Sequence, residues 1–212
     1  MKLKQLVFNP LQENTYVIWD ESGECAIVDP GCFHRAEREE LEAFIANQHL
    51  KPVRLLLTHA HFDHVFGCRW AAERWNLSPE LHADELPVLR MAVAVAQVYG
   101  FRMEAPPETV DLIEAGELLR FGKTELDVRH TPGHSPGSVS FYHAPSGQVV
   151  VGDVLFRGSI GRTDLPGGSM DTLERSIRQQ LYTLPDATTV WSGHGPETSI
   201  AHEKAYNPFV PA

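Results

Sequence analysis

Apolar and polar positions along the chain fall into two batches of strand-like runs with helix-like segments between them. Apolar residues at helical spacing predict helices at residues 36–48, 65–75, 85–97 and 171–184. Short apolar runs bounded by turn residues predict strands. We expect these strands at residues 3–8, 16–19, 25–28, 53–57, 81–83, 110–113, 118–121, 126–129, 139–142, 149–151 and 189–191. Two batches of strands separated by helices favour two packed sheets with helices outside.

The length of the chain bounds its organisation. A chain of 212 residues that is 42% hydrophobic is typical of one domain with a substantial core, so we expect a single domain over residues 1–212. Residues 84–108 join a helical pattern to Pro106-Pro107, which is typical of a lid or a groove wall. A plain surface helix fits the same pattern, and the sequence leaves both interpretations open.

Charge and composition narrow the class of partner. The formal net charge is −10, and the 18 Lys and Arg residues form no cluster, which disfavours a nucleic-acid partner. We expect no signal peptide and no membrane span, because no apolar stretch is long enough. Three cysteines at no disulfide-like spacing favour free thiols and a cytoplasmic location. The sequence does not decide between a monomer and a small homo-oligomer.

Four apolar strands end in residues that can bind a metal ion. The first runs into Thr58 and a loop with three histidines and an aspartate, and the other three end at turns that contain glycine. If these strand ends converge, their polar side chains meet in one cleft. The side chains concerned are His59, His61, Asp63, His64, His134, Asp153 and His194.

This set of donors indicates a catalytic metal site. His59 and His61 are two residues apart in an extended segment, so they face the same side, whereas Asp63 and His64 follow a turn. Imidazoles suit Zn and Fe, and a carboxylate can bridge two ions. Three protein ligands for each ion leave a position open for water. We therefore interpret the residues as a two-metal site.

Other candidate residues have simpler interpretations. Asp29 in Asp29-Pro30-Gly31 is a good turn former, although a carboxylate that orients a ligand histidine is the alternative. Cys68 follows the histidine loop closely and is expected to be a small buried residue. His130 is expected to support the site at most. The remaining histidines are interpreted as surface or packing residues without ligand-like neighbours: His34, His49, His82, His143 and His202.

With these motifs the chain resembles the metallo-β-lactamase superfamily, and within it the short form of glyoxalase II (hydroxyacylglutathione hydrolase) that lacks a C-terminal helical domain. The H-x-H-x-D-H motif at residues 59–64 is specific for the superfamily. The segments more typical of the glyoxalase II branch are Gly161-Arg162-Thr163-Asp164 and Asn207-Pro208-Phe209. The resemblance implies an α+β fold, a four-layer αβ/βα sandwich of two mixed β-sheets.

The resemblance also implies how the ligands divide. One ion takes His59, His61 and His134, the second takes Asp63, His64 and His194, and Asp153 bridges both. Asp29 and Thr58 are then expected to contact the ligands instead of the ions. Asp153 disfavours a true β-lactamase, since zinc-binding relatives commonly have Cys at that position.

The implied activity is hydrolysis of a small thioester of the S-lactoylglutathione type. Two divalent ions, Zn²⁺ first with Fe or Mn as alternatives, would supply a bridging hydroxide as nucleophile. Asp63 and Asp153 are the catalytic candidates. An anionic part of the substrate could contact Arg162, Tyr99 or Arg102, although each also fits a surface role.

A redox enzyme is the alternative interpretation. The chain also resembles persulfide dioxygenases in these motifs, and such enzymes use one Fe(II) ion on two histidines and one aspartate. In this chain those residues would be His59, His134 and Asp153. The ligand set is the same in both cases, so the sequence does not separate them. Measurements of metal content and oxygen uptake would separate the hydrolase from the dioxygenase.

Overall fold

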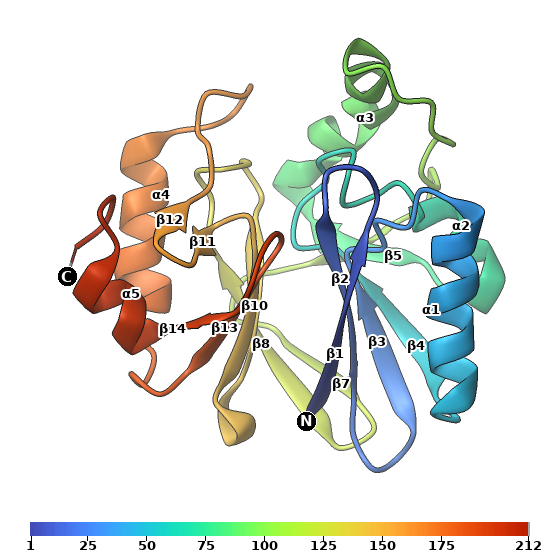
Figure 1. The fold of residues 1–212 in the computed structure, drawn as a ribbon, viewed down its shortest axis with the longest axis horizontal. Helices are drawn as coiled ribbons and strands as arrows, with labels where there is room; N and C mark the ends of the chain where they lie inside the picture. The colour runs from blue at the N-terminus through green and yellow to red at the C-terminus, as the bar shows by residue number, and fades with distance from the viewer. Residues whose placement is uncertain (212) are drawn as a thin grey trace.

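The computed structural model describes residues 1–211 and consists of two six-stranded mixed sheets packed face to face with helices outside, as the sequence predicted (Figure 1). The strands of the first sheet follow the order of the chain, with antiparallel pairing from β1 to β3 and parallel pairing from β3 to β6. They are β1 (Lys2–Phe8), β2 (Glu13–Trp19), β3 (Glu24–Val28), β4 (Lys51–Leu56), β5 (Pro79–His82) and β6 (Asp111–Ile113).

The second sheet has the strand order β14-β13-β10-β9-β8-β7, and a separate two-stranded sheet joins β11 to β12. β10 pairs with β13 in parallel, and its other neighbour, β9, is antiparallel. The strands are β7 (Leu118–Phe121), β8 (Thr124–His130), β9 (Val139–His143), β10 (Gln148–Gly152), β11 (Leu155–Phe156), β12 (Ser159–Ile160), β13 (Thr189–Ser192) and β14 (Thr198–Ser199).

Helices cover the outer face of each sheet. In Figure 1, α1 and α2 lie beside the first sheet, and α4 and α5 lie beside the second. The helical segments are α1 (Arg35–Asn47), α2 (Cys68–Trp75), η1 (Ala83–Glu85), α3 (Leu86–Val98), η2 (Ala144–Ser146), α4 (Met170–Ser176), η3 (Ile177–Leu181) and α5 (Ile200–Tyr206). Among the described residues, no helix has the length and apolar character that crossing a membrane requires.

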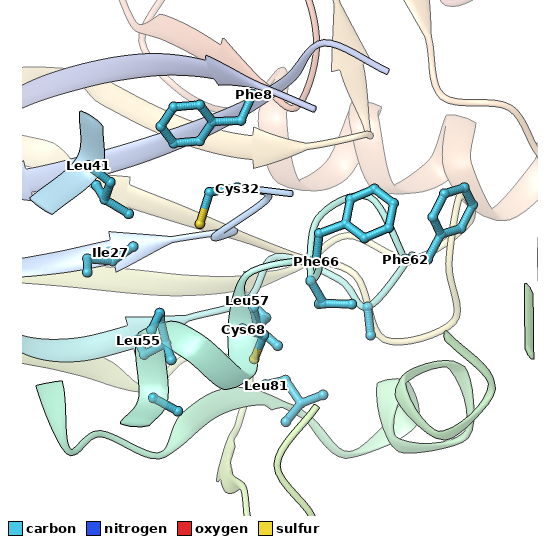
Figure 2. Packing of buried hydrophobic residues seen from close by; sticks show 14 of the residues in the cluster. Phe8, Ile27, Cys32, Leu41, Leu55, Leu57, Phe62, Phe66, Cys68 and Leu81 are labelled. Atoms are coloured by element: carbon cyan, nitrogen blue, oxygen red, sulfur yellow. The ribbon is translucent and has the colours of Figure 1, made fainter. Parts of the chain in front are cut away.

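Alternation along the strands divides the core into three layers. Leu55 of β4 packs outward in a cluster with Leu41 of α1, whereas the next residue, Leu56, packs inward against the second sheet. Figure 2 shows part of the outer cluster, including Leu41, Leu55 and Ile27. Val150 of β10 likewise faces the space between the sheets, and its neighbours Val149 and Val151 face α4. This period of two explains why apolar runs without polar interruption form central strands.

The strand directions bring the candidate ligands to one edge. β4 ends before His59, and β8, β10 and β13 end before His134, Asp153 and His194. Hydrogen bonds join the two sheets at this edge, from Val139 N to Thr58 O at 2.8 Å and from Asn14 N to Gly193 O at 2.7 Å. The loops that follow the strands therefore meet.

The structure corrects two helix boundaries. The helix predicted at residues 65–75 begins at Cys68, because Val65 closes a turn onto Phe62 and Gly67 donates its backbone N–H to Pro30 O. The helix predicted at residues 171–184 passes into a π-helical turn that ends at Leu181. The sequence pattern also missed β11, β12, β14 and α5.

Candidate metal centre

The structure brings six of the seven candidate ligands together in two groups of three. His59, His61 and His134 form one group in which the donor atoms lie within 4.8 Å of one another. The second group, defined by the same limit, consists of Asp63, His64 and His194. These groups are the two triads that the resemblance implied.

Asp153 lies between the two groups. One carboxylate oxygen, Oδ2, is 3.6 Å from Nε2 of His134 and 3.6 Å from Nε2 of His194. The other oxygen, Oδ1, is 3.4 Å from Nε2 of His64. A carboxylate in this position can contact ions held by either triad.

The histidine loop is anchored in the core. Phe62 and Phe66 flank Asp63 and His64, and their ring centroids are 5.5 Å apart in the outer hydrophobic cluster (Figure 2). Asn9, at positive φ, donates its side-chain amide to the Asp63 carbonyl at 3.0 Å. The loop is therefore fixed by packing and by a hydrogen bond from the turn after β1.

Asp29 and Thr58 hold one side of the site in place. Asp29 has the left-handed φ of +48°, which points its carboxylate at the end of β4. Its Oδ1 accepts from Thr58 N at 2.7 Å, and its Oδ2 accepts from Thr58 Oγ1 at 2.5 Å. The same Oδ2 lies 3.1 Å from Nδ1 of His64. Asp29 is therefore both a turn residue and a partner of a candidate ligand.

Backbone and hydroxyl oxygens orient three further histidines. Nδ1 of His59 lies 3.1 Å from Thr58 Oγ1, and Nδ1 of His134 lies 2.8 Å from the carbonyl of Arg162. His194 Nδ1 lies 3.1 Å from the carbonyls of Leu11 and Gln12, in the loop between β1 and β2. A histidine whose Nδ1 proton is given to an oxygen presents an unprotonated Nε2, which is the form that binds metal.

Unpartnered buried atoms test whether the residues fit a metal. Among residues 1–211, Nε2 of His59, Nε2 of His64 and Oδ1 of Asp153 are buried and lack a hydrogen-bond partner. Buried polar atoms without partners are rare and costly in native proteins. All three belong to the two groups and Asp153 between them, so divalent ions fit the donors that are present.

The electrostatics of the site also favour cations. Burial raises the pKa of Asp153, but the charges of the neighbouring histidines, that of His64 first, outweigh burial and lower that pKa well below its usual value. Burial lowers the pKa of His64, but Asp153 and Asp63 outweigh it and raise the pKa well above the usual value. Burial, followed by the charge of His134, lowers the pKa of His61 to about 4. Positive charge is therefore favoured at the centre, where His61 remains a neutral donor.

Gly193 permits the close approach of the ligands. A Cβ added at this position would lie 2.1 Å from Asp153 Oδ1 and 2.7 Å from Cε1 of His64. The backbone cannot retreat easily, since Gly193 N donates to Gly152 O and its carbonyl accepts from Asn14 N. A glycine is therefore required before His194, because any side chain there would displace Asp153 or His64.

Glu85, which the sequence analysis did not identify, joins two ligand loops. The side chain is completely buried at the start of α3, and burial raises its pKa. Its Oε2 accepts from Ala60 N at 2.9 Å, between His59 and His61, and its Oε1 accepts from Ser135 Oγ and from Gly137 N. A single glutamate at a helix start carries no sequence signal for this role.

Glu13 is a second buried carboxyl group that the sequence analysis missed. It is 0% exposed, and its Oε1 lies 3.9 Å from Nδ1 of His64 without a hydrogen-bond partner in the part of the chain that the structure describes. Burial raises its pKa well above the usual value. Burial therefore favours the neutral form of this carboxyl group, which lies behind the candidate ligand His64.

The three candidate substrate residues lie in different surroundings. Arg162 lines a cavity beside His134 and Asp153, but its guanidinium is held by Asp164 through two hydrogen bonds of 2.7 Å. Tyr99 is half exposed, with its ring centroid 5.3 Å from that of Phe62. Arg102 is exposed and lines neither of the cavities that border the ligands.

His82 and His130 pack against each other outside the two groups of candidate ligands. His82 was expected to have no ligand-like neighbours, yet it groups with Asp84 and His130 within 4.8 Å. The two rings stack at 4.4 Å with an interplanar angle of 19°. Parallel rings direct their lone pairs alongside each other instead of toward a common point, so the packing interpretation of His82 stands. His130 contacts Pro136 O and none of the candidate ligands.

The amino-acid sequence is similar to those of metal-dependent hydrolases. The chain matches the model of the metallo-β-lactamase superfamily over residues 8–194. It is 41% identical to the probable metallo-hydrolase YqgX of Bacillus subtilis, over 99% of this chain and 98% of YqgX. It is 34% identical to the hydroxyacylglutathione hydrolase GloC of Haemophilus influenzae, over 99% of this chain and 98% of GloC.

Solved structures agree with the sequence relatives. The structure of the BLEG-1 B3 metallo-β-lactamase matches with a TM-score of 0.91 and 37% identity, covering 100% of both chains. The structure of TTHA1623 in a di-iron-bound form matches with a TM-score of 0.89 and 41% identity, covering 97% of this chain and 99% of that one. The chain belongs to the metallo-β-lactamase superfamily, which confirms the resemblance seen in its motifs.

Proposed function

We propose that the protein is a metal-dependent hydrolase of small thioesters, of the hydroxyacylglutathione hydrolase type. The observation that carries the proposal is the pair of ligand triads with the Asp153 carboxylate between them. The full-length similarity to GloC and to YqgX supports hydrolysis, and it supports glutathione thioesters as the first substrates to test.

We assign His59, His61 and His134 to one divalent ion, Asp63, His64 and His194 to the other, and Asp153 to both. Zn²⁺ is our first choice, and iron is supported by the di-iron form of TTHA1623. When bound, such ions supply Lewis acidity toward the acyl carbonyl and lower the pKa of a water molecule to about 7.

The protein's own residues orient the reactants. Asp63 is 8% exposed and its Oδ2 lies 3.3 Å from Nε2 of His194, so its carboxylate can also orient the attacking water. Asp29 keeps the proton of His64 on Nδ1, and the Arg162 carbonyl does the same for His134. A thiolate is a fair leaving group, so the reaction needs little proton donation to sulfur.

Charged side chains flank one side of the ligands. A cavity of about 500 Å³ borders His134, Asp153 and His194, and both Arg157 and Arg162 line it. Carboxylates of a thiol carrier such as glutathione would be attracted there. This cavity supports an anionic thiol carrier, because both Arg157 and Arg162 are exposed residues on its wall.

Hydrolysis of S-lactoylglutathione by metal-replete protein tests the proposal. We expect turnover in the wild type and its loss in His59→Ala and Asp153→Ala, each measured together with metal content. His202→Ala, at a residue of α5 whose ring centroid lies 5.2 Å from that of Tyr206, is the control histidine and should keep turnover. Metal-replete protein that hydrolyses neither this thioester nor other glutathione thioesters would contradict the proposal.

Two further assays separate the competing activities. The similarity to BLEG-1 makes β-lactam hydrolysis the second candidate, and a chromogenic cephalosporin tests it directly. One iron per chain with oxygen uptake on glutathione persulfide would favour the dioxygenase alternative. We expect two ions per chain, no oxygen uptake and faster turnover of thioesters than of the cephalosporin.

A further inference from the structure

An apolar cavity of about 390 Å³ borders the site at His61, and neither Arg157 nor Arg162 lines it. One of its walls is the loop at Ala60–Phe62, which includes His61, and another is formed by α3. The third wall comes from Pro136 and residues 165–167. On α3 the lining side chains are Val88, Met91, Ala92 and Val95.

The lining of this cavity is almost entirely apolar. Among the described residues, His61 is the only titratable side chain on its walls. Met91 is 55% exposed and Val95 is 37% exposed, so α3 presents apolar surface to an open cavity. Isolated apolar side chains are common on protein surfaces, but a concave apolar surface next to a few polar groups is typical of a ligand site.

The two cavities border different members of the candidate ligand set. His61 lines the apolar cavity, whereas His134, Asp153 and His194 line the cavity with Arg157 and Arg162. A thioester has two arms, an acyl group and a thiol carrier, joined at the carbonyl. Because a charged carrier is favoured beside the arginines, the apolar cavity is left for the acyl arm.

We propose that the cavity between His61 and α3 is an acyl pocket that selects thioesters with apolar acyl groups. The inference rests on the proposed thioester hydrolysis and names its substrate class. The volume of the cavity is within the range of about 300–1,000 Å³ that is usual for small-molecule sites. A lactoyl group has a hydroxyl and only three carbons, so it would leave most of this apolar surface uncovered.

Glutathione thioesters that differ only in the acyl group test the pocket. We expect kcat/KM of the metal-replete protein to rise about fourfold for each added methylene from acetyl to hexanoyl, in line with the free energy of burying a methylene. Lactoylglutathione should fall below butyrylglutathione. A kcat/KM that stays level or falls along the series would overturn the acyl pocket while leaving thioester hydrolysis intact.

Matched variants locate the effect. Val95→Phe fills the cavity and should remove the gain for hexanoyl while sparing acetyl. Val98→Phe is the same substitution on the same helix, at a position that is 85% exposed and outside the lining, and should keep the full gain. Met91→Gln keeps the length of the side chain and should reduce the gain for each methylene. An unchanged chain-length dependence in both Val95→Phe and Met91→Gln would overturn the proposal.

Binding measured without turnover separates the pocket from the reaction. Calorimetry of metal-loaded protein with acetate, butyrate and hexanoate should give affinities that rise about fourfold for each methylene in the wild type and in Val98→Phe. Val95→Phe should bind the three carboxylates alike. If no thioester is hydrolysed, the proposed function fails, and this series still decides on the pocket. An affinity independent of chain length in the wild type would overturn it.

Discussion

Oδ2 of Asp29 lies 3.1 Å from Nδ1 of His64 and also accepts a hydrogen bond from the Thr58 hydroxyl. The aspartate thus connects the turn after β3 with the end of β4 and with one candidate ligand. Its position at a φ of +48° gives the Asp-Pro-Gly turn a role beyond the reversal of the chain.

Replacement of this carboxylate should weaken metal binding. In Asp29→Asn an amide N–H₂ can replace Oδ2, which faces Nδ1 of His64, so the proton would move to Nε2. We expect a loss of metal affinity of about 10–100-fold, measured by competition with a chromophoric chelator. Asp20→Asn is the control, at a buried aspartate whose carboxylate accepts from Ser22 N, Lys123 N and Thr124 Oγ1, away from the candidate ligands. Equal metal affinity in Asp29→Asn and the wild type would contradict this role.

Glu85 should affect the triad of His59, His61 and His134 selectively. Glu85→Gln introduces an N–H₂ group where each oxygen accepts from a donor, so we expect unfolding to become easier by about 1–3 kcal/mol. Metal affinity should fall as well, because the two ligand loops lose their common tie. Denaturant melts and metal titration measure the two effects.

Glu203→Gln provides the matched control for Glu85. Glu203 is also fully buried, but it accepts from Gly158, Thr198 and Asn207 instead of the ligand loops. We expect a similar loss of stability with wild-type metal affinity. If the two variants lost metal to the same extent, Glu85 would be an ordinary structural residue.

Gly193→Ala should displace Asp153. The added Cβ would overlap the Asp153 carboxylate, so we expect a large loss of metal content after reconstitution. Gly147→Ala is the control: its φ of +59° imposes a backbone cost of about 1–2 kcal/mol, but its Cβ meets nothing within 4 Å. Gly147→Ala should melt earlier and bind metal normally. Normal metal content in Gly193→Ala would show that the bridge tolerates the added methyl group.

The pH dependence of stability should depend on Asp20. Burial raises the pKa of this carboxyl group, but hydrogen bonds from Ser22, Thr124 and Lys123 outweigh burial and lower the pKa below its usual 3.8. Because the pKa is lowered in the folded state, the stabilisation by the Asp20 carboxylate is complete above pH 3.8 and declines as the pH falls below 3.8. Asp20→Asn should therefore lower the free energy of unfolding by about 1–2 kcal/mol at neutral pH. The difference from the wild type should shrink as the pH falls below 3.8. Urea melts at several pH values measure it, and a constant difference down to the acid limit would contradict it.

The clustering of the candidate ligands could be predicted because each follows a local pattern. An apolar run such as residues 53–57 stops abruptly, and residues that can bind a metal ion follow it closely. The same stretch of sequence therefore indicates both the end of a strand and the donors placed there. The two packed sheets were predictable because the strands come in two batches with helices between them, and the family resemblance implied that both sheets are mixed. The boundary of α2 was not, because Gly67 gives its N–H to Pro30, a distant residue.

The supporting contacts depend on tertiary structure and lack such patterns. Glu85 looks like any acidic residue at a helix start, and Arg162 acts on His134 through its carbonyl, which every residue has. The short helix α5 was missed because buried Glu203, not an apolar stripe, ties it to the rest of the chain. Local periodicity does not report contacts of this kind.

Metal stoichiometry tests the two-triad assignment most directly. The wild-type protein, reconstituted with Zn²⁺ and freed of excess by gel filtration, should contain two ions per chain by elemental analysis. His194→Ala should retain about one ion, held by His59, His61 and His134, and Asp153→Ala should retain less than the wild type. A wild-type protein that binds a single ion at saturating metal, with His194→Ala unchanged from it, would contradict the assignment.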